Sequence, residues 1–117
     1  MGRPILLIED DDELREVMQL VLRSQGFDVA CAVDGLEAIS LLANGLRPSV
    51  ILLDLMLPKL DGFAFRERAK ALADAPLIVV SALDDLAARV QGLNPTAWFR
   101  KPVDLDVLIA AVARLVH

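Results

Sequence analysis

Short apolar runs alternate with amphipathic segments along the whole chain. The apolar runs are rich in Ile, Leu and Val, and polar residues do not alternate within them. This pattern predicts strands that are covered on both faces, as in a parallel sheet. The expected strands cover residues 4–8, 28–31, 49–53, 77–80 and 97–99.

The segments between these runs have helical periodicity. Leu14, Val17, Met18, Val21 and Leu22 recur at helical spacing, with a stop signal at position 26. A second helix is expected from 34–35 to 44–45, and a third from 61–62 to a point before residue 76. A fourth should cover roughly 84–91, with a glycine after it. A fifth should begin after position 104, where an aspartate is a good N-cap, and run to the end.

Strands that alternate with helices indicate a doubly wound α/β fold of five βα units, because such crossovers are right-handed. The 117 residues fit one domain, 1–117, and 56% of them are hydrophobic. No apolar run approaches the roughly 18 residues that a membrane helix needs. No signal peptide is visible, so a cytoplasmic protein without a membrane partner is expected.

Charge and cysteine content narrow the function classes. The net charge of −5 disfavours direct binding to nucleic acid, which requires clustered Lys and Arg. Cys31 is the only cysteine, so no internal disulfide can form.

Candidate chemistry gathers where the predicted strands end. A sheet of this kind binds ligands beyond the carboxyl ends of its strands. Glu9 and Asp10 follow the first strand and Asp54 follows the third, whereas Ser81 and Lys101 follow the fourth and fifth. These acids, a hydroxyl and an ammonium should therefore meet at one edge.

The acids need more than a structural explanation. A preference for negative charge at a helix N-terminus explains Asp11 and Asp12, but not Asp54 at the end of a buried strand. Two carboxylates about 4 Å apart repel by roughly 4 kcal/mol at an effective dielectric of 20. Such a cluster must raise a pKa, recruit a lysine or bind a cation.

Lys101 offsets one of the three negative charges of Glu9, Asp10 and Asp54. The remaining charge suits a hard cation held by oxygen, and Mg²⁺ is the natural candidate. A transition-metal site is disfavoured because suitable His and Cys ligands are missing. A nucleotide or flavin site is also disfavoured, since the acidic loop after the first strand would repel phosphate.

Five motifs occur in order along the chain, and they lie at the strand ends and at the start of the third helix. The motifs are Leu7-Ile8-Glu9-Asp10-Asp11, Leu52-Leu53-Asp54-Leu55-Met56-Leu57-Pro58, Asp61-Gly62, Val79-Val80-Ser81-Ala82 and Lys101-Pro102. Together they resemble the CheY-like receiver domains of two-component response regulators, and the resemblance covers essentially the whole chain. It implies a flavodoxin-like (βα)5 fold with strand order 2-1-3-4-5.

The resemblance also implies roles for individual residues. Asp54 resembles the phosphoacceptor, and Lys101 the lysine that pairs with its carboxylate or phosphoryl group. Asp10 resembles the direct Mg²⁺ ligand, and Glu9 would act beside it or through water. Met56 would offer its backbone carbonyl to the metal.

Two further roles concern the readout of the switch. Ser81 resembles the hydroxyl that swings to the phosphoryl oxygen. Trp98 stands where the family has a switching Tyr or Phe, and a fixed edge aromatic is an equal alternative. The peptide bond between Lys101 and Pro102 is expected to be cis.

The sequence departs from the family pattern near its C-terminus. The loop at 94–97 is shorter by about two residues and contains Pro95, which removes a backbone donor. The last helix should place Leu105, Leu108, Ile109, Val112, Leu115 and Val116 on its core side. Its other face has few charges, which favours either a docking surface or tolerated small apolar residues.

The leading hypothesis is a phosphoacceptor switch and not a turnover enzyme. The switch would catalyse only its own Mg²⁺-dependent phosphorylation and dephosphorylation. A sensor histidine kinase or phosphotransfer protein would supply the phosphoryl group. A downstream protein would bind the new surface, and the last two helices are the candidate docking site. The alternatives are a phosphorylation-independent interaction module and a receiver excised from a larger regulator or hybrid kinase.

Overall fold

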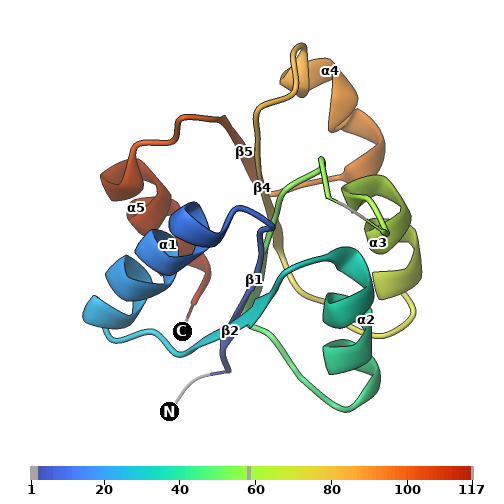
Figure 1. The fold of residues 1–117 in the computed structure, drawn as a ribbon, viewed down its shortest axis with the longest axis horizontal. Helices are drawn as coiled ribbons and strands as arrows, with labels where there is room; N and C mark the ends of the chain where they lie inside the picture. The colour runs from blue at the N-terminus through green and yellow to red at the C-terminus, as the bar shows by residue number, and fades with distance from the viewer. Residues whose placement is uncertain (1–2, 58, 117) are drawn as a thin grey trace.

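The computed structural model describes residues 3–57 and 59–116. Five parallel strands form one sheet in the order β2-β1-β3-β4-β5, which confirms the predicted fold (Figure 1). The strands are β1 (Ile5–Ile8), β2 (Val29–Ala32), β3 (Val50–Leu53), β4 (Leu77–Ser81) and β5 (Ala97–Arg100). The helices are α1 (Asp12–Ser24), α2 (Gly35–Ala43), α3 (Gly62–Ala69), α4 (Leu86–Arg89) and α5 (Leu105–Leu115).

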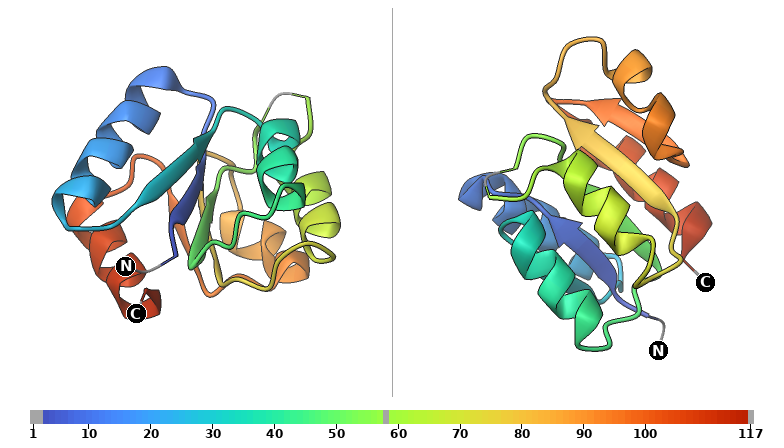
Figure 2. Two further views of the ribbon diagram at one scale, coloured as in Figure 1. Left: turned by 90° about the horizontal axis from the view of Figure 1, so that it is seen from below. Right: turned by 90° about the vertical axis from the view of Figure 1, so that its right-hand side faces the viewer.

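Two layers of helices cover the sheet. Alternate residues of one strand point to opposite faces. Ile5 and Leu7 of β1 therefore pack with α1 and α5, whereas Leu6 and Ile8 pack with α2, α3 and α4. Figure 2 shows the two helix layers on either side of the strands. All four residues of β1 and of β3 are buried, as the uninterrupted apolar runs predict.

Aspartate side chains begin four of the helices. Asp11, Asp34, Asp61 and Asp104 each accept a hydrogen bond from a backbone N–H of the first turn. This contact satisfies a donor that has no partner within the helix. Gly26 and Gly45 follow α1 and α2 with positive φ angles of 91° and 105°, and so act as the predicted stops.

The prediction for the fourth helix is wrong in length. Instead of a helix over 84–91, the chain forms the four-residue α4 and then a 3-10 turn, Gln91–Leu93. Asp85 precedes α4 with a left-handed backbone, φ 54°, and its side chain makes no capping hydrogen bond. Asn94 is also left-handed, φ 53°, where the chain turns into β5. These two turns leave room for only one helical turn.

The last helix matches its predicted faces in part. Leu108 and Val112 are fully buried, and the other four predicted core residues are partly buried. Val107 on the opposite face is 49% exposed. Among the described residues, no helix combines the length and the apolar character that crossing a membrane requires.

Candidate functional site

The sheet register brings three acids together. Ile8 pairs with Leu53, so the residues that follow β1 and β3 leave the sheet side by side. The backbone N–H of Asp54 also donates to the carbonyl of Ile8 at 3.3 Å. One carboxylate oxygen from each of Glu9, Asp10 and Asp54 lies within 4.8 Å of the others. The predicted acidic cluster is therefore present.

Lys101 lies between two of these acids. Its Nζ is 2.7 Å from Oε1 of Glu9 and 2.9 Å from Oδ2 of Asp54. The carboxylates are buried, with 3% and 6% of their side chains exposed, and 19% of the lysine side chain is exposed. One ammonium is thus shared by two buried carboxylates, while Asp10 is exposed.

The pKa values of Glu9 and Lys101 are both raised, for different reasons. Burial raises the pKa of Glu9 above its ordinary 4.5, the negative charge of Asp54 adds to the rise, and hydrogen bonds from Lys101 and Asp11 oppose it. Burial alone would lower the pKa of Lys101. Its hydrogen bonds and charge attraction to Glu9 and Asp54 outweigh burial, so the pKa of Lys101 lies above 10.5.

Backbone groups fix the two acidic turns. The N–H of Met56 donates to Oδ1 of Asp54 at 3.0 Å, and the N–H of Asp11 donates to Oε2 of Glu9 at 3.1 Å. Met56 is 56% exposed, and it contacts Asp54 through its backbone N–H. Gly62 closes the turn after β3, where its N–H donates to the carbonyl of Leu55 at 3.1 Å. A Cβ at this position would lie 2.6 Å from the Cα of Leu55, so there is no room for a side chain.

The residues predicted to transmit the switch lie on the same side of the sheet. Ser81 ends β4 and is fully buried; its Oγ accepts from the N–H of Leu83 at 3.4 Å, and its carbonyl accepts from the N–H of Lys101 at 3.0 Å. Trp98 is 45% exposed on the edge strand β5. The bond between Lys101 and Pro102 is cis, as predicted. Pro58, a part of the third-strand motif, lies outside the described residues.

Sequence reasoning missed two contacts of Glu9. The contact of Lys101 with Glu9 depends on the path of the lysine side chain across the sheet edge, and no local sequence pattern predicts this path. Arg15 donates from Nη1 to the carbonyl of Glu9 at 2.9 Å. Its position in the first turn of the helix after the acidic loop was an available signal.

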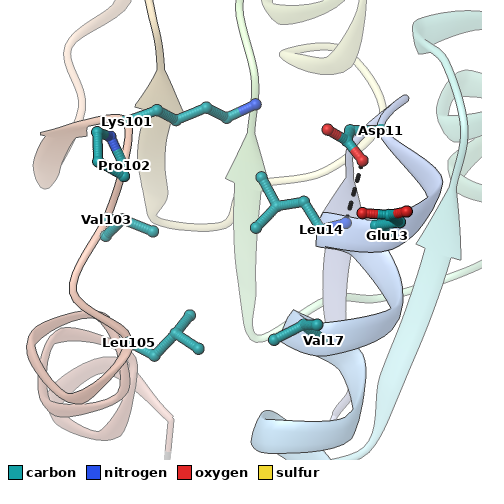
Figure 3. A pocket seen from close by; sticks show the side chains of 8 residues that line it. All are labelled: Asp11, Glu13, Leu14, Val17, Lys101, Pro102, Val103 and Leu105. Carbon is teal, nitrogen blue, oxygen red and sulfur yellow. Dashed lines mark hydrogen bonds between the residues drawn. The ribbon is translucent and has the colours of Figure 1, made fainter.

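A groove of about 560 Å³ adjoins the acidic cluster between α1 and α5. Figure 3 shows Leu14, Val17, Val103 and Leu105 facing one another across it, with Lys101 at its upper end and the N-terminus of α1 at its rim. An apolar groove thus leads to the ammonium that holds Asp54.

Comparison with known proteins agrees with this geometry. Residues 5–113 match the family model of the response regulator receiver domain. The chain is 37% identical over 118 residues to the DNA-binding dual master transcriptional regulator RpaA of Synechocystis, covering 97% of this chain and 48% of that protein. It is 36% identical over 116 residues to the response regulator MprA of a Mycobacterium species, covering 97% of this chain and 50% of that protein.

Solved structures give the same result. The receiver domain of a Francisella response regulator superimposes with a TM-score of 0.85 at 30% identity, covering 97% of this chain and 96% of that one. A response regulator receiver protein from Pseudomonas putida gives 0.84 at 30% identity, covering 97% and 98%. The chain spans about half the length of the curated relatives that it matches. It belongs to the family of response regulator receiver domains, the signalling switches of two-component systems.

Proposed function

We propose that Asp54 accepts a phosphoryl group from a phosphohistidine donor in a Mg²⁺-dependent reaction and thereby changes what this domain binds. The supporting observation is the arrangement of Asp54 itself. Its Oδ1 is held by the N–H of Met56 and its Oδ2 by Lys101, beside two more acids at a sheet edge. A fixed carboxylate next to cation ligands suits nucleophilic phosphoryl transfer.

The donor set fits Mg²⁺. Glu9, Asp10 and Asp54 offer hard oxygen ligands close together, and Asp10 is exposed enough to receive a hydrated ion. The backbone carbonyl of Met56 is proposed as a further ligand. When bound, the ion would neutralise negative charge on the transferring phosphoryl group.

The residues of the chain would divide the remaining work. A carboxylate oxygen of Asp54 forms the new P–O bond as the P–N bond to the donor imidazole breaks, and the imidazole keeps that electron pair. The ammonium of Lys101 then pairs with the oxygens of the phosphoryl group. The hydroxyl of Ser81 then donates to a phosphoryl oxygen instead of accepting from Leu83. Loss of the phosphoryl group by hydrolysis would reset the domain.

The groove between α1 and α5 is proposed to receive the donor protein. A phosphohistidine must approach Asp54 from outside, and this apolar groove opens beside Lys101. Val17 lines it with 45% of its surface exposed. Cytoplasmic location follows as part of the same proposal, since histidine kinases present their phosphohistidine there.

Intact-mass measurement tests the phosphoacceptor. Incubation with acetyl phosphate and Mg²⁺ should add one phosphoryl group, about 80 Da, to the wild-type chain. The matched variant Asp54→Asn should remain unmodified, and so should the wild type in the presence of excess EDTA. A wild-type chain that gains no mass, or an Asp54→Asn variant that gains it equally, would exclude Asp54 as the acceptor.

A second comparison tests the donor groove. Val17→Glu should slow transfer from a phosphorylated histidine kinase core that modifies the wild-type chain, because a charge would enter the apolar groove. Transfer from acetyl phosphate should be unchanged. Leu20→Glu is the control, since Leu20 is 71% exposed on the same helix and lies outside this groove. Equal slowing by both variants would contradict the assignment.

A receiver within a larger regulator is the second candidate, favoured by the coverage of only about half of each curated relative. In that case the downstream partner is another domain of the same protein, which α4, β5 and α5 could contact. Partner binding that is equal for wild type and Asp54→Ala would instead favour a phosphorylation-independent interaction module.

A further inference from the structure

Arg15 holds the acidic turn from the side of helix α1. Its Nη1 donates to the backbone carbonyl of Glu9 at 2.9 Å, and its Nη2 pairs with Oδ1 of Asp12 at 2.5 Å. The backbone N–H of the same residue donates to the carbonyl of Asp11 at 2.9 Å. The Arg15 side chain is 16% exposed, so its head group lies largely against the protein.

These contacts matter because of what they leave for Asp10. Glu9 is fixed by Lys101 and by the N–H of Asp11, and Asp11 is fixed as the N-cap of α1. Within residues 3–57 and 59–116, the exposed carboxylate of Asp10 receives no hydrogen bond from another residue. Its place in the cluster therefore depends on the backbone on either side, which Arg15 joins to the helix.

We infer that Arg15 is a positioning residue for the cation site: it keeps the turn from Glu9 to Asp11 in the conformation that turns the Asp10 carboxylate toward Glu9 and Asp54. This inference rests on the proposed function, because it assumes that the cluster binds Mg²⁺. Outer groups that orient metal ligands typically contribute about 10–100-fold to metal affinity.

Charge and position act in opposite directions at Arg15. A guanidinium near the cluster repels a divalent cation, so removing its charge alone would tighten Mg²⁺ binding. Removing its hydrogen bond to the carbonyl of Glu9 would loosen the turn and weaken binding. The sign of the change in Kd therefore separates a positioning role from a purely electrostatic one.

The test is a Mg²⁺ titration of the full chain, followed by the amide signals of residues 9–12 and 54–56 in ¹H–¹⁵N spectra. Arg15→Met keeps the aliphatic stem and removes both the donors and the charge. We expect its Kd for Mg²⁺ to be about tenfold higher than that of wild type, at the lower end of the range for such groups because the lost charge acts in the other direction.

Arg23→Met is the matched control. Arg23 belongs to the same helix and also donates to a backbone carbonyl, that of Val29 at 3.2 Å, but it lies at the other end of the helix from the acids. Its Kd should equal that of wild type. A Kd that is unchanged or lower in Arg15→Met overturns the inference, and so does an equal increase in both variants.

Arg15→Lys keeps the test decisive if Arg15→Met does not fold. A lysine retains the charge but has a different donor geometry. Positioning therefore predicts a Kd higher than that of wild type, because the hydrogen bond to the carbonyl of Glu9 is disturbed while the charge is kept, whereas a purely electrostatic role predicts no change. Absence of Mg²⁺ binding to the wild type would instead refute the proposed function, which keeps the two failures distinct.

Discussion

At the scale of single residues, the sharing of one ammonium by two carboxylates makes Asp54 and Lys101 unequal in their effect on stability. Asp54→Asn removes one of the two charges that Lys101 must balance, and it preserves an oxygen for the N–H of Met56. Without Mg²⁺ we expect its free energy of unfolding at neutral pH to be unchanged or up to about 1 kcal/mol higher.

Lys101→Met provides the comparison for that experiment. It leaves two buried carboxylates without a counter-charge, so we expect a loss of about 2 kcal/mol, below the usual range for fully buried pairs because the lysine is partly exposed. Urea unfolding of the three chains measures both changes. A substantial loss in Asp54→Asn would show that its pair with Lys101 is a net stabilising contact.

The raised pKa of Lys101 gives a test at alkaline pH. A group with a raised folded-state pKa contributes stability that is complete below its unfolded-state value and is lost above the folded-state value. The stability that wild type has in excess of Lys101→Met should thus be constant from neutral pH up to pH 10.5 and then decline as the pH rises further. Urea unfolding across this range measures the excess. The chain has no tyrosine, and both chains contain Cys31, so few other groups interfere. A decline that starts near neutral pH would contradict the direction of the shift.

At the scale of elements, α2 meets the loop that follows β3 at a very close approach. A Cβ on Gly35 would lie 2.4 Å from the carbonyl oxygen of Leu60, whereas one on Gly92 would meet nothing within 4 Å. Gly35→Ala should therefore lower the free energy of unfolding by about 2 kcal/mol, because backbone must shift. Denaturant unfolding measures this loss.

Gly92→Ala is the control for that prediction. It should be neutral or should stabilise the chain by up to about 1 kcal/mol, since alanine restricts the unfolded chain at a position without steric conflict. Similar losses of stability in both variants would mean that the close approach between Gly35 and Leu60 is not the reason why Gly35→Ala is destabilising.

The elements also show where sequence reasoning succeeds. Each strand was predicted to within one residue at its ends, because apolar runs that stop at Glu9 or Asp54 mark burial directly. The predicted length of the fourth helix was wrong because Ala87, Ala88 and Arg89 favour a helix. The left-handed turns at Asp85 and Asn94, which shorten it, have no distinctive pattern in the sequence.

At the scale of the whole molecule, the site could be predicted because topology does most of the positioning. Parallel strands place their ends at one edge, so Glu9, Asp10 and Asp54 had to meet once the order of strands was known. The contact of Lys101 with Glu9 could not be predicted, because it depends on the path of a side chain between elements, whereas the position of Arg15 in the first turn of α1 offered a signal for its contact with the Glu9 carbonyl.

Mg²⁺ should stabilise the entire domain if it binds only the folded cluster. At ten times its Kd the gain is about 1.4 kcal/mol, which corresponds to a rise in Tm of about 6 °C for a domain of this size. Differential scanning calorimetry measures the rise. It should be lost in Asp10→Asn and kept in Asp74→Asn, which alters an exposed acid before β4, at the other end of the strands. An equal rise in both variants would indicate non-specific ion effects.

The Lys101 side chain connects two strands of the sheet, in addition to balancing the charge of the acids. The lysine follows the edge strand β5, yet it contacts Asp54 after the central strand β3, so its side chain crosses the end of β4, where Ser81 lies. The flexible side chain of Lys101 thus links the edge strand β5 to the central strand β3. If Asp54 gains a phosphoryl group as proposed, Lys101 must change its direction, and we expect β5, the edge strand that carries Trp98, to be the first part of the surface to shift.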